Sequence, residues 1–157
     1  MKDTDFESLH YFGPHEFDSI GGHEHLHKNV VTLANDIRRA YGSPLRVTSA
    51  WRSSDGNSLV GGADISQHVL GRALDLVPIS PSPSTFADLV MASLRFWCGG
   101  LGIYDDGHIH IDTRLGNFGA RWVVSHGKHL AWTWDNLAEV VGRGRKRLAP
   151  PTGSHPG

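Results

Sequence analysis

The segment at residues 108–112 reads HIHID, and its alternation constrains the fold more than any other part of the chain. Side chains of a β-strand point alternately to opposite faces, so His108, His110 and Asp112 would share one face and the two isoleucines the other. Aspartate is disfavoured in strands, so a face made only of groups that can bind a metal needs a compensating role. We therefore predict a strand at about 108–113 that is buried on its isoleucine side.

The remaining pattern predicts a single α+β domain. Apolar residues recur every three or four positions from Leu26 to Tyr41, which predicts a helix over residues 26–41. An Asp-Asp-Gly sequence at 105–107 predicts a hairpin turn after a strand at about 100–104. Because helices and strands do not alternate strictly, we expect a small, mainly antiparallel sheet with helices packed on one side. The other expected elements are strands at 45–50, 72–77 and 120–125, helices at about 85–97 and 134–141, and irregular segments at 1–24, 52–64 and 78–84.

Length and charge narrow the possible functions. With 157 residues the chain fits one domain, which we place at 1–141, and the basic, Pro- and Gly-rich segment 142–157 is expected to be a disordered tail. A net charge of −1 argues against a nucleic-acid partner. The single cysteine, Cys98, excludes an internal disulfide and a cysteine-rich zinc module. No apolar run reaches the roughly 18 residues of a membrane span. We also expect the chain to be a monomer.

Eleven histidines stand out in this charge-balanced chain, and histidine is the commonest metal ligand. His68 and Asp75 flank Gly71, where a bend would bring both side chains toward one point. With the polar face at 108–112 they supply the two imidazoles and one carboxylate of a catalytic zinc site, which keeps one coordination position open. A solvated strand face without function is the alternative interpretation.

The other histidines are expected to play no part in this site. His23, His25 and His27 are expected to be exposed at the start of a helix, although they could form a second metal site. His126 and His129 are expected on the surface or at a cleft rim.

Five segments resemble one enzyme family, in the same order along the chain. SQHVLGRALD at 66–75 resembles the Ser-x-His-x-x-Gly-x-Ala-x-Asp motif of the zinc D-alanyl-D-alanine carboxypeptidases, and HIHID resembles their later strand ending in His-x-Asp. SAWRS at 49–53 is similar to the family's Ser-Gly-Tyr-Arg-Ser segment. YFGPHEFD at 11–18 and DTRLGNFGARW at 112–122 resemble the opening and the ending of short, phage-type members. The resemblance implies a fold shared with the hedgehog signalling domain, a small antiparallel sheet flanked by helices.

The resemblance also implies roles for the matching residues. His68, Asp75 and His110 correspond to the zinc ligands. Arg52 corresponds to an arginine that holds the substrate's terminal carboxylate, a task suited to a planar, permanently charged guanidinium. Ser66 is expected to orient a ligand or its loop and to contribute to substrate binding. Ala50 and Trp51 stand where the family has Gly-Tyr, a difference that would reshape the wall of the substrate pocket.

The identity of the catalytic base stays open at this stage. His108 corresponds to a catalytic histidine in similar members, whereas other branches place a carboxylate just before the last ligand. Asp105 and Asp106 are the carboxylates available in that region. Asp112 is expected to fix the orientation of an imidazole from outside the metal site.

The activity implied by this resemblance is zinc-dependent hydrolysis of peptidoglycan peptide stems next to D-alanine, by a D,D-carboxypeptidase or an endolysin-type endopeptidase. A zinc-bearing cell-wall binding module without catalysis is the main alternative, and a non-haem iron oxygenase using His110 and Asp112 is a weaker one. The first residues lack an apolar stretch behind a basic start, so we expect no secretory signal. We expect a protein made in the cytoplasm that reaches the bacterial wall after release, as a phage or prophage product, or within a virion.

Overall fold

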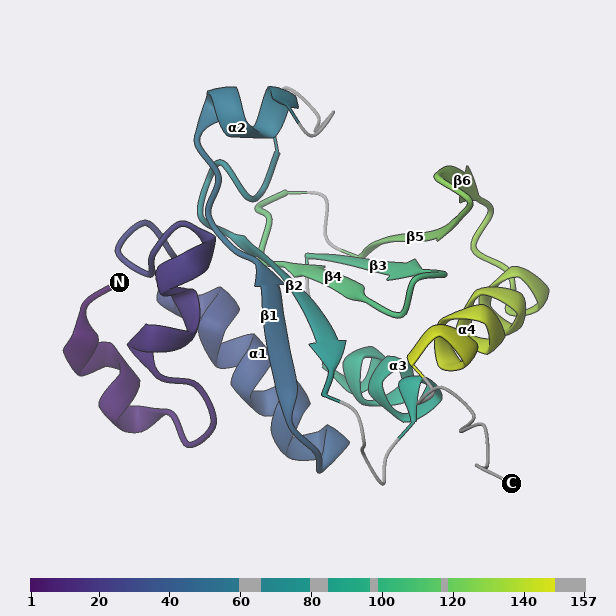
Figure 1. Cartoon of the computed structure of the whole chain (residues 1–157), viewed down its shortest axis with the longest axis horizontal. Helices are drawn as coiled ribbons and strands as arrows, with labels where there is room; N and C mark the ends of the chain where they lie inside the picture. The colour runs from purple at the N-terminus through teal and green to yellow at the C-terminus, as the bar shows by residue number, and fades with distance from the viewer. Residues whose placement is uncertain (60–65, 80–84, 97–98, 117–118, 149–157) are drawn as a thin grey trace, which may run out of the picture.

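A six-stranded sheet with the strand order β1-β2-β4-β3-β5-β6 forms the centre of the fold (Figure 1). The computed structural model describes residues 1–59, 66–79, 85–96, 99–116 and 119–148. Expectations for Cys98, for 80–84 and for 149–157 therefore lie outside the described residues. Neighbouring strands pair antiparallel except β3 and β5, which pair parallel. The strands are β1 (Leu45–Ser49), β2 (Ala73–Pro78), β3 (Gly100–Tyr104), β4 (Ile109–Asp112), β5 (Ala120–Ser125) and β6 (Lys128–Leu130).

Three longer helices support the sheet, and their contacts confirm the α+β class. Helix α1 packs against β2 and β4, α4 packs against β3 and β5, and α3 lies against both helices. No helix in the described ranges has the length and apolar character needed to cross a bilayer. The helices are α1 (Lys28–Tyr41), α2 (Ser54–Leu59), α3 (Phe86–Arg95) and α4 (Trp134–Leu148), with 3₁₀ turns at Asp3–Ser8 and Pro14–Ile20.

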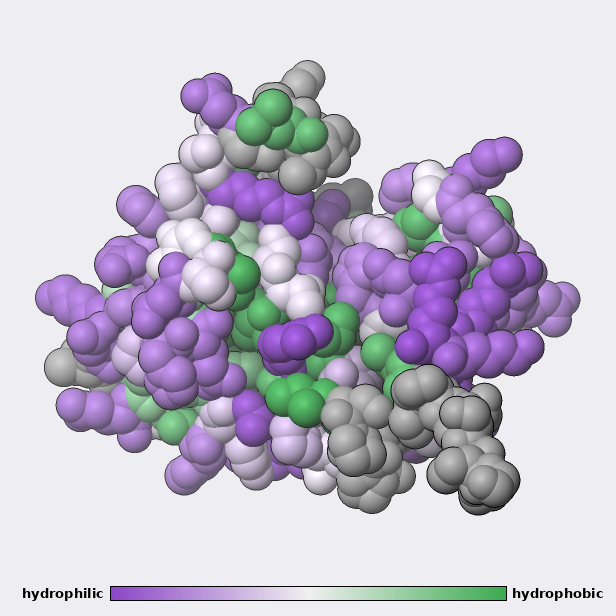
Figure 2. All heavy atoms as spheres, viewed as in Figure 1, coloured by the Kyte–Doolittle hydropathy of each residue, from purple (hydrophilic) through white to green (hydrophobic). Residues whose placement is uncertain are grey.

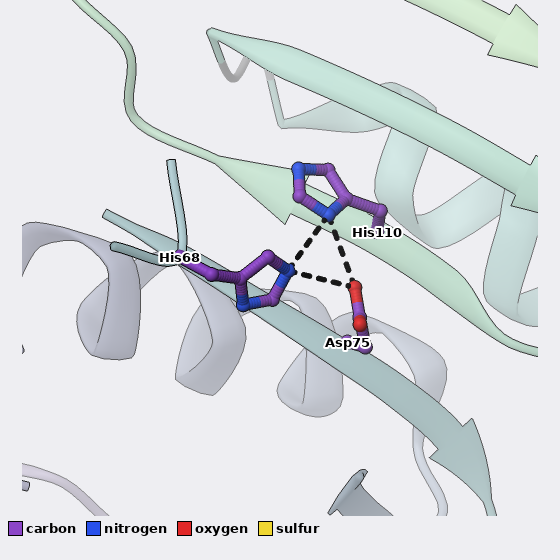
Figure 3. Close-up of side chains that lie close together, drawn as sticks. All are labelled: His68, Asp75 and His110. Atoms are coloured by element: carbon purple, nitrogen blue, oxygen red, sulfur yellow. Dashed lines mark hydrogen bonds and ion pairs between the residues drawn. The ribbon is translucent and has the colours of Figure 1, made fainter. Parts of the chain in front are cut away.

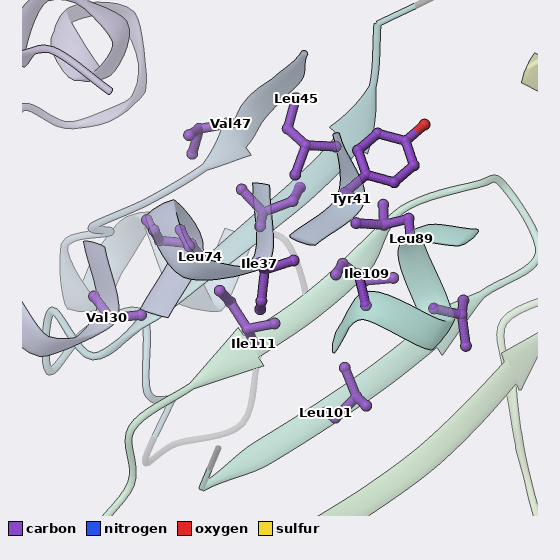
Figure 4. Close-up of a cluster of buried hydrophobic side chains, with 14 of the residues drawn as sticks. Val30, Ile37, Tyr41, Leu45, Val47, Leu74, Leu89, Leu101, Ile109 and Ile111 are labelled. Carbon is purple, nitrogen blue, oxygen red and sulfur yellow. The ribbon is translucent and has the colours of Figure 1, made fainter. Parts of the chain in front are cut away.

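The apolar core lies between the sheet and these helices (Figure 4). Ile109 and Ile111 of β4 and Leu74 of β2 are fully buried there, as the alternation in HIHID predicts. Burying such a side chain contributes about 1.5–3 kcal/mol. The core side of the sheet therefore fixes which side chains β2 and β4 present on the opposite face.

Two elements differ from the sequence expectations. Residues 54–59 form helix α2 although their Gly-, Asn- and Ser-rich composition has poor helix propensity and predicts a loop. Strand β6 was not expected, because the turn before it does not carry a typical hairpin sequence. His126 and Gly127 both have positive φ, at 51° and 72°, a conformation that asparagine and glycine adopt more readily than histidine.

The expectation of a disordered tail from residue 142 is wrong for residues 142–148. They continue helix α4, which buries an apolar stripe ending at Gly144 and Leu148. Gly144 packs against the ring of Phe86 on α3, and Leu148 packs on Gly107 in the β3–β4 turn. The basic side chains of the last turn lie near the negative end of the helix dipole, which stabilises the helix end. Figure 2 shows strongly hydrophilic side chains gathered over this helix.

The two glycines of α4 should respond in opposite directions to the same substitution. Gly142→Ala should raise the free energy of unfolding by about 0.5–1 kcal/mol, because alanine favours helix and a Cβ there meets nothing within 4 Å. Gly144→Ala should lower it by about 1–2 kcal/mol, because the new Cβ would lie 2.7 Å from the buried Phe86 ring. Urea unfolding of both variants tests this difference, and equal small effects would mean that 142–148 is not packed.

Candidate metal centre

His68, Asp75 and His110 meet on the face of the sheet opposite the core (Figure 3). His68 Nε2 lies 3.3 Å from Asp75 Oδ1 and 3.2 Å from His110 Nδ1, and His110 Nδ1 lies 3.0 Å from the same carboxylate oxygen. Within the described ranges this is the one group of three or more such residues close enough to share a metal ion. The three expected ligands are therefore brought together.

Strand pairing places two of the three side chains. Asp75 on β2 and His110 on β4 are direct partners in the antiparallel register. Their neighbours Leu74, Leu76 and Ile111 point into the core, so both polar side chains point away from it.

His68 comes from the loop before β2, and Gly71 shapes that loop. Gly71 has φ of +67°, and a Cβ there would overlap the carbonyl oxygen of His25. Its own carbonyl accepts a hydrogen bond of 2.8 Å from the backbone N–H of His27, which ties the loop to the start of α1. A glycine is therefore required between the first two ligands.

Each imidazole is fixed by a hydrogen bond from its second nitrogen. His68 Nδ1 lies 2.6 Å from the carbonyl oxygen of Ala50 and can only donate to it. His110 Nε2 lies 3.1 Å from Asp112 Oδ2, as expected for Asp112, and this carboxylate also accepts hydrogen bonds from Arg114. With these tautomers, both imidazoles turn a lone pair toward Asp75. Three electron-pair donors then face one point with no hydrogen between them, an arrangement that a cation stabilises.

The charges around the centre also favour a cation. Burial raises the pKa of Asp75, but when no cation is bound, hydrogen bonds from His110 and His68 outweigh burial and hold this pKa well below its usual range. Burial also raises the pKa of Asp112, but the hydrogen bonds with His110 and Arg114 lower this pKa by more. For His110, burial lowers the pKa, but Asp112 and Asp75 raise it by more. The site therefore contains two carboxylates that attract positive charge to the imidazole between them.

Arg52 and Ser66 lie beside the ligands. Arg52 Nη2 donates to Asp75 Oδ2 at 3.2 Å and to Ser49 Oγ at 2.6 Å, and Nε donates to the same hydroxyl at 2.9 Å. Ser66 Oγ accepts a 3.3 Å hydrogen bond from the backbone N–H of His68, consistent with the expectation that it orients the ligand loop.

The three base candidates have different surroundings. His108 Nδ1 lies 2.6 Å from Asp106 Oδ1, and the ring stacks on Tyr104 with 4.0 Å between ring centroids. Asp105 instead accepts hydrogen bonds from the Ser125 hydroxyl and the His126 backbone N–H, at 3.0 and 2.9 Å. These bonds lower the pKa of Asp105, with the His126 N–H as the largest cause. The Asp105 carboxylate thus holds the β5–β6 turn, whereas Asp106 orients an imidazole.

A cleft of about 890 Å³ extends from the three ligands across the sheet. Tyr104, Trp122 and Arg114 line it, although no sequence motif predicted a role for them. No local sequence pattern points to Trp122, because its partner Gly102 lies on β3, where a Cβ would overlap the indole. The other lining residues are Arg52, Ser66, Gln67, Asp105, Asp106, His108, Val124, His126, Gly127, His129 and Arg147.

The remaining histidines partly follow expectation. His126 and His129 are exposed and line the cleft, as predicted for its rim. His23 is buried rather than exposed, because it packs edge-on against Phe6 and its Nε2 pairs with Asp3 at 2.7 Å. Among the described residues, the amino-terminal histidines form no metal-binding group.

Comparison with known proteins places this geometry in a family. A family model described as peptidase M15 matches residues 17–112. The chain belongs to the peptidase M15 family. The matched segment includes His68, Asp75 and His110. The family resemblance inferred from the motifs is therefore confirmed. The iron-oxygenase alternative has no support, since Asp112 bonds the outer nitrogen of His110 and does not face the centre.

One solved structure similar to this M15 peptidase is the crystal structure of the L-Ala D-Glu endopeptidase ChiX from Serratia marcescens. The sequences are 17% identical, and the match covers 57% of this chain and 82% of that chain with a TM-score of 0.40. No curated protein matches the sequence.

Substitution of Gly71 should lower the stability of the fold and disturb the geometry of the three metal-ligand candidates. Gly71→Ala should lower the free energy of unfolding by about 2–4 kcal/mol, because a positive φ and overlap with the His25 carbonyl add together. Gly42→Ala is the matched control: its φ of +74° is similar but a Cβ meets nothing within 4 Å, so the loss should be about 1–2 kcal/mol. Urea unfolding and metal content are the measurements, and equal losses would contradict the role of the His25 contact.

Proposed function

We propose that this chain is a zinc-dependent peptidase that hydrolyses the peptide stems of peptidoglycan next to D-alanine. The observation that carries the proposal is the convergence of two imidazole lone pairs and one carboxylate at the base of a cleft. Membership of the M15 family supports peptide hydrolysis, and the five motif segments support the choice of substrate. The proposal includes release of a terminal D-alanine and cleavage within a stem, which differ in their products.

The donor set fits zinc. Two nitrogens and one oxygen are the protein ligands of many catalytic zinc sites, which leave the fourth position for water or substrate. The outer hydrogen bonds of His68 and His110 are those that orient zinc ligands. In such a site zinc supplies Lewis acidity, which polarises a carbonyl and makes water a better nucleophile near neutral pH.

His108 is the residue we assign to proton transfer. Its Nδ1–H donates to Asp106, so Nε2 keeps a lone pair that can take the proton of the attacking water and return it to the leaving amine. Asp106 fixes this tautomer, as a carboxylate does beside many catalytic imidazoles. Asp105 is less suited to the role, because the β5–β6 turn already occupies its carboxylate.

We assign Arg52 to bind the carboxylate of the substrate. Within the described ranges the guanidinium bonds Ser49 and Asp75 through Nε and Nη2, and we assign Nη1 to the peptide. The bonds to Ser49 and Asp75 fix the plane of the guanidinium, and a fixed plane favours the directional binding of a carboxylate. Positioning of this kind turns binding energy into orientation at the reacting bond.

Digestion of purified peptidoglycan tests the function, with mass analysis of the released fragments. We expect fragments cut next to D-alanine, no cleavage in the presence of a chelator, and recovery with Zn²⁺. His68→Ala should lose both activity and metal, whereas His27→Ala, which alters an exposed histidine outside the cleft, should keep both. Elemental analysis measures the metal. Full zinc occupancy in His68→Ala would place the metal elsewhere, and zinc binding without any cleavage would favour a binding module.

The assignment of the base predicts an order among three variants. His108→Ala should keep zinc and lower kcat by about 10²–10⁴-fold, the range for loss of a general acid or base. Asp106→Asn should cause a smaller loss, because the imidazole remains but its tautomer is less fixed. Asp105→Ala should mainly lower the melting temperature, since this carboxylate holds the β5–β6 turn. Near-normal turnover of His108→Ala beside a folded but inactive Asp105→Ala would assign the base to Asp105.

A further inference from the structure

Tyr104 ends strand β3 on the same face as the metal centre. Leu101 and Ile103 of this strand are buried in the core, so the alternate position carries the Tyr104 side chain to the opposite side. There it lines the cleft together with His68, Asp75 and His110. Its phenol ring stacks on His108, with an interplanar angle of 19°. The stacked ring leaves the hydroxyl as the polar group that Tyr104 brings to the cleft.

Trp122 fixes the position and the direction of this hydroxyl. The indole Nε1–H donates a 3.0 Å hydrogen bond to the Tyr104 oxygen. An indole nitrogen can only donate, so the tyrosine oxygen is the acceptor and its own hydrogen must point elsewhere. In the part of the chain that the structure describes, no protein group accepts that hydrogen. A hydroxyl that lines a cleft with its acceptor side occupied is left to donate to a bound molecule.

The indole itself is held between the metal centre and Tyr104. Its ring lies 5.2 Å from the His110 ring, between centroids, and Arg114 lies over it at 5.5 Å. Gly102 on β3 leaves space for the indole, because a Cβ at position 102 would overlap it. One rigid side chain therefore touches a metal ligand and the phenol, which sets the hydroxyl at a fixed place relative to the ligands.

The electrostatic surroundings keep the phenol protonated. Burial raises the pKa of Tyr104 against the opposing effect of the Trp122 hydrogen bond, and the charges of Asp75 and Asp106 raise it further. The net direction is upward from a value that is already far above neutral pH. The phenol is therefore a hydrogen-bond donor at neutral pH.

We propose that the Tyr104 hydroxyl donates a hydrogen bond to the carbonyl oxygen of the peptide bond being cleaved. The inference rests on the proposed peptidase function and adds a catalytic residue to it. The bond strengthens as negative charge develops on that oxygen in the transition state, while the proton stays on Tyr104 throughout. Donors aimed at developing charge in a site from which water is excluded lower the barrier more than they strengthen substrate binding. Trp122 is a positioning residue that acts through Tyr104.

Tyr104→Phe is the direct test, because it removes one oxygen and keeps the ring stacked on His108. We expect a fall in kcat of about 10²-fold with little change in KM, as for loss of one oxyanion donor. Zinc content should equal that of the parent protein. Tyr11→Phe, at an exposed tyrosine outside the cleft, is the matched control and should keep parental kcat and KM. Trp122→Phe should also lower kcat, by less than Tyr104→Phe.

Binding of two unreactive peptides gives a second readout that needs no turnover. The first carries a tetrahedral phosphinate in place of the scissile bond, and the second is the corresponding product peptide. Measured by calorimetry, Tyr104→Phe should lower the affinity for the phosphinate peptide about 10²-fold and leave the affinity for the product peptide unchanged. Equal weakening of both probes, or no weakening of either, would overturn the proposal. If the parent protein cleaves no peptidoglycan peptide, the proposed function fails, and the two probes still decide whether Tyr104 recognises a tetrahedral oxygen.

Discussion

The antiparallel register of β2 with β4 is the constraint on which the rest of the molecule depends. It sets Asp75 opposite His110 and, on the reverse face, Leu74 opposite Ile111. A slip of either strand by one residue would turn the polar side chain of that strand into the core and its apolar ones out to water. The large free-energy cost of that exchange holds the strands in place. The same burial that stabilises the sheet therefore positions two of the three metal-ligand candidates, and the chain needs no separate device to align them.

The third ligand depends on a loop, and its restraint is of a different kind. His68 is held through its Nδ1 bond to the Ala50 carbonyl and through the close approach of Gly71 to the start of α1. His110 is held through Asp112, whose charge Arg114 partly balances. Ligand directions are thus set by one backbone carbonyl, a carboxylate and a guanidinium that lie outside the metal position. Such a site is preorganised, so little conformational entropy is lost when a cation binds.

The sequence predicted the site better than it predicted the cleft. His68, Asp75 and His110 could be found because strand alternation and a glycine-containing motif have a regular spacing that translates directly into direction. Local spacing also predicted α1 and the hairpin of β3 and β4, because one pattern is periodic and the other is bounded by an Asp-Asp-Gly turn. It failed at α2 and β6, where a short helix and a hairpin form from residues of poor intrinsic propensity. It also ended α4 too early, because Gly142 and Gly144 suggest flexibility, whereas Gly144 serves close packing against Phe86. The alignment of Tyr104 with Trp122 depends on the parallel pairing of β3 with β5, a contact between distant segments that no local pattern reports.

The two walls of the cleft come from different parts of the chain. The segment matched by the family model, 17–112, carries the three ligand candidates, Arg52 and His108, whereas Trp122, His126, His129 and Arg147 follow it. The later wall is joined to the earlier one by a chain of contacts from Arg143 to His126, to Ser125 and to Asp105. The three ligand candidates and most of the second wall therefore lie in separate segments of the chain. Substitutions at His126, His129 or Arg147 should therefore change the shape of the cleft while the three ligand candidates keep their places.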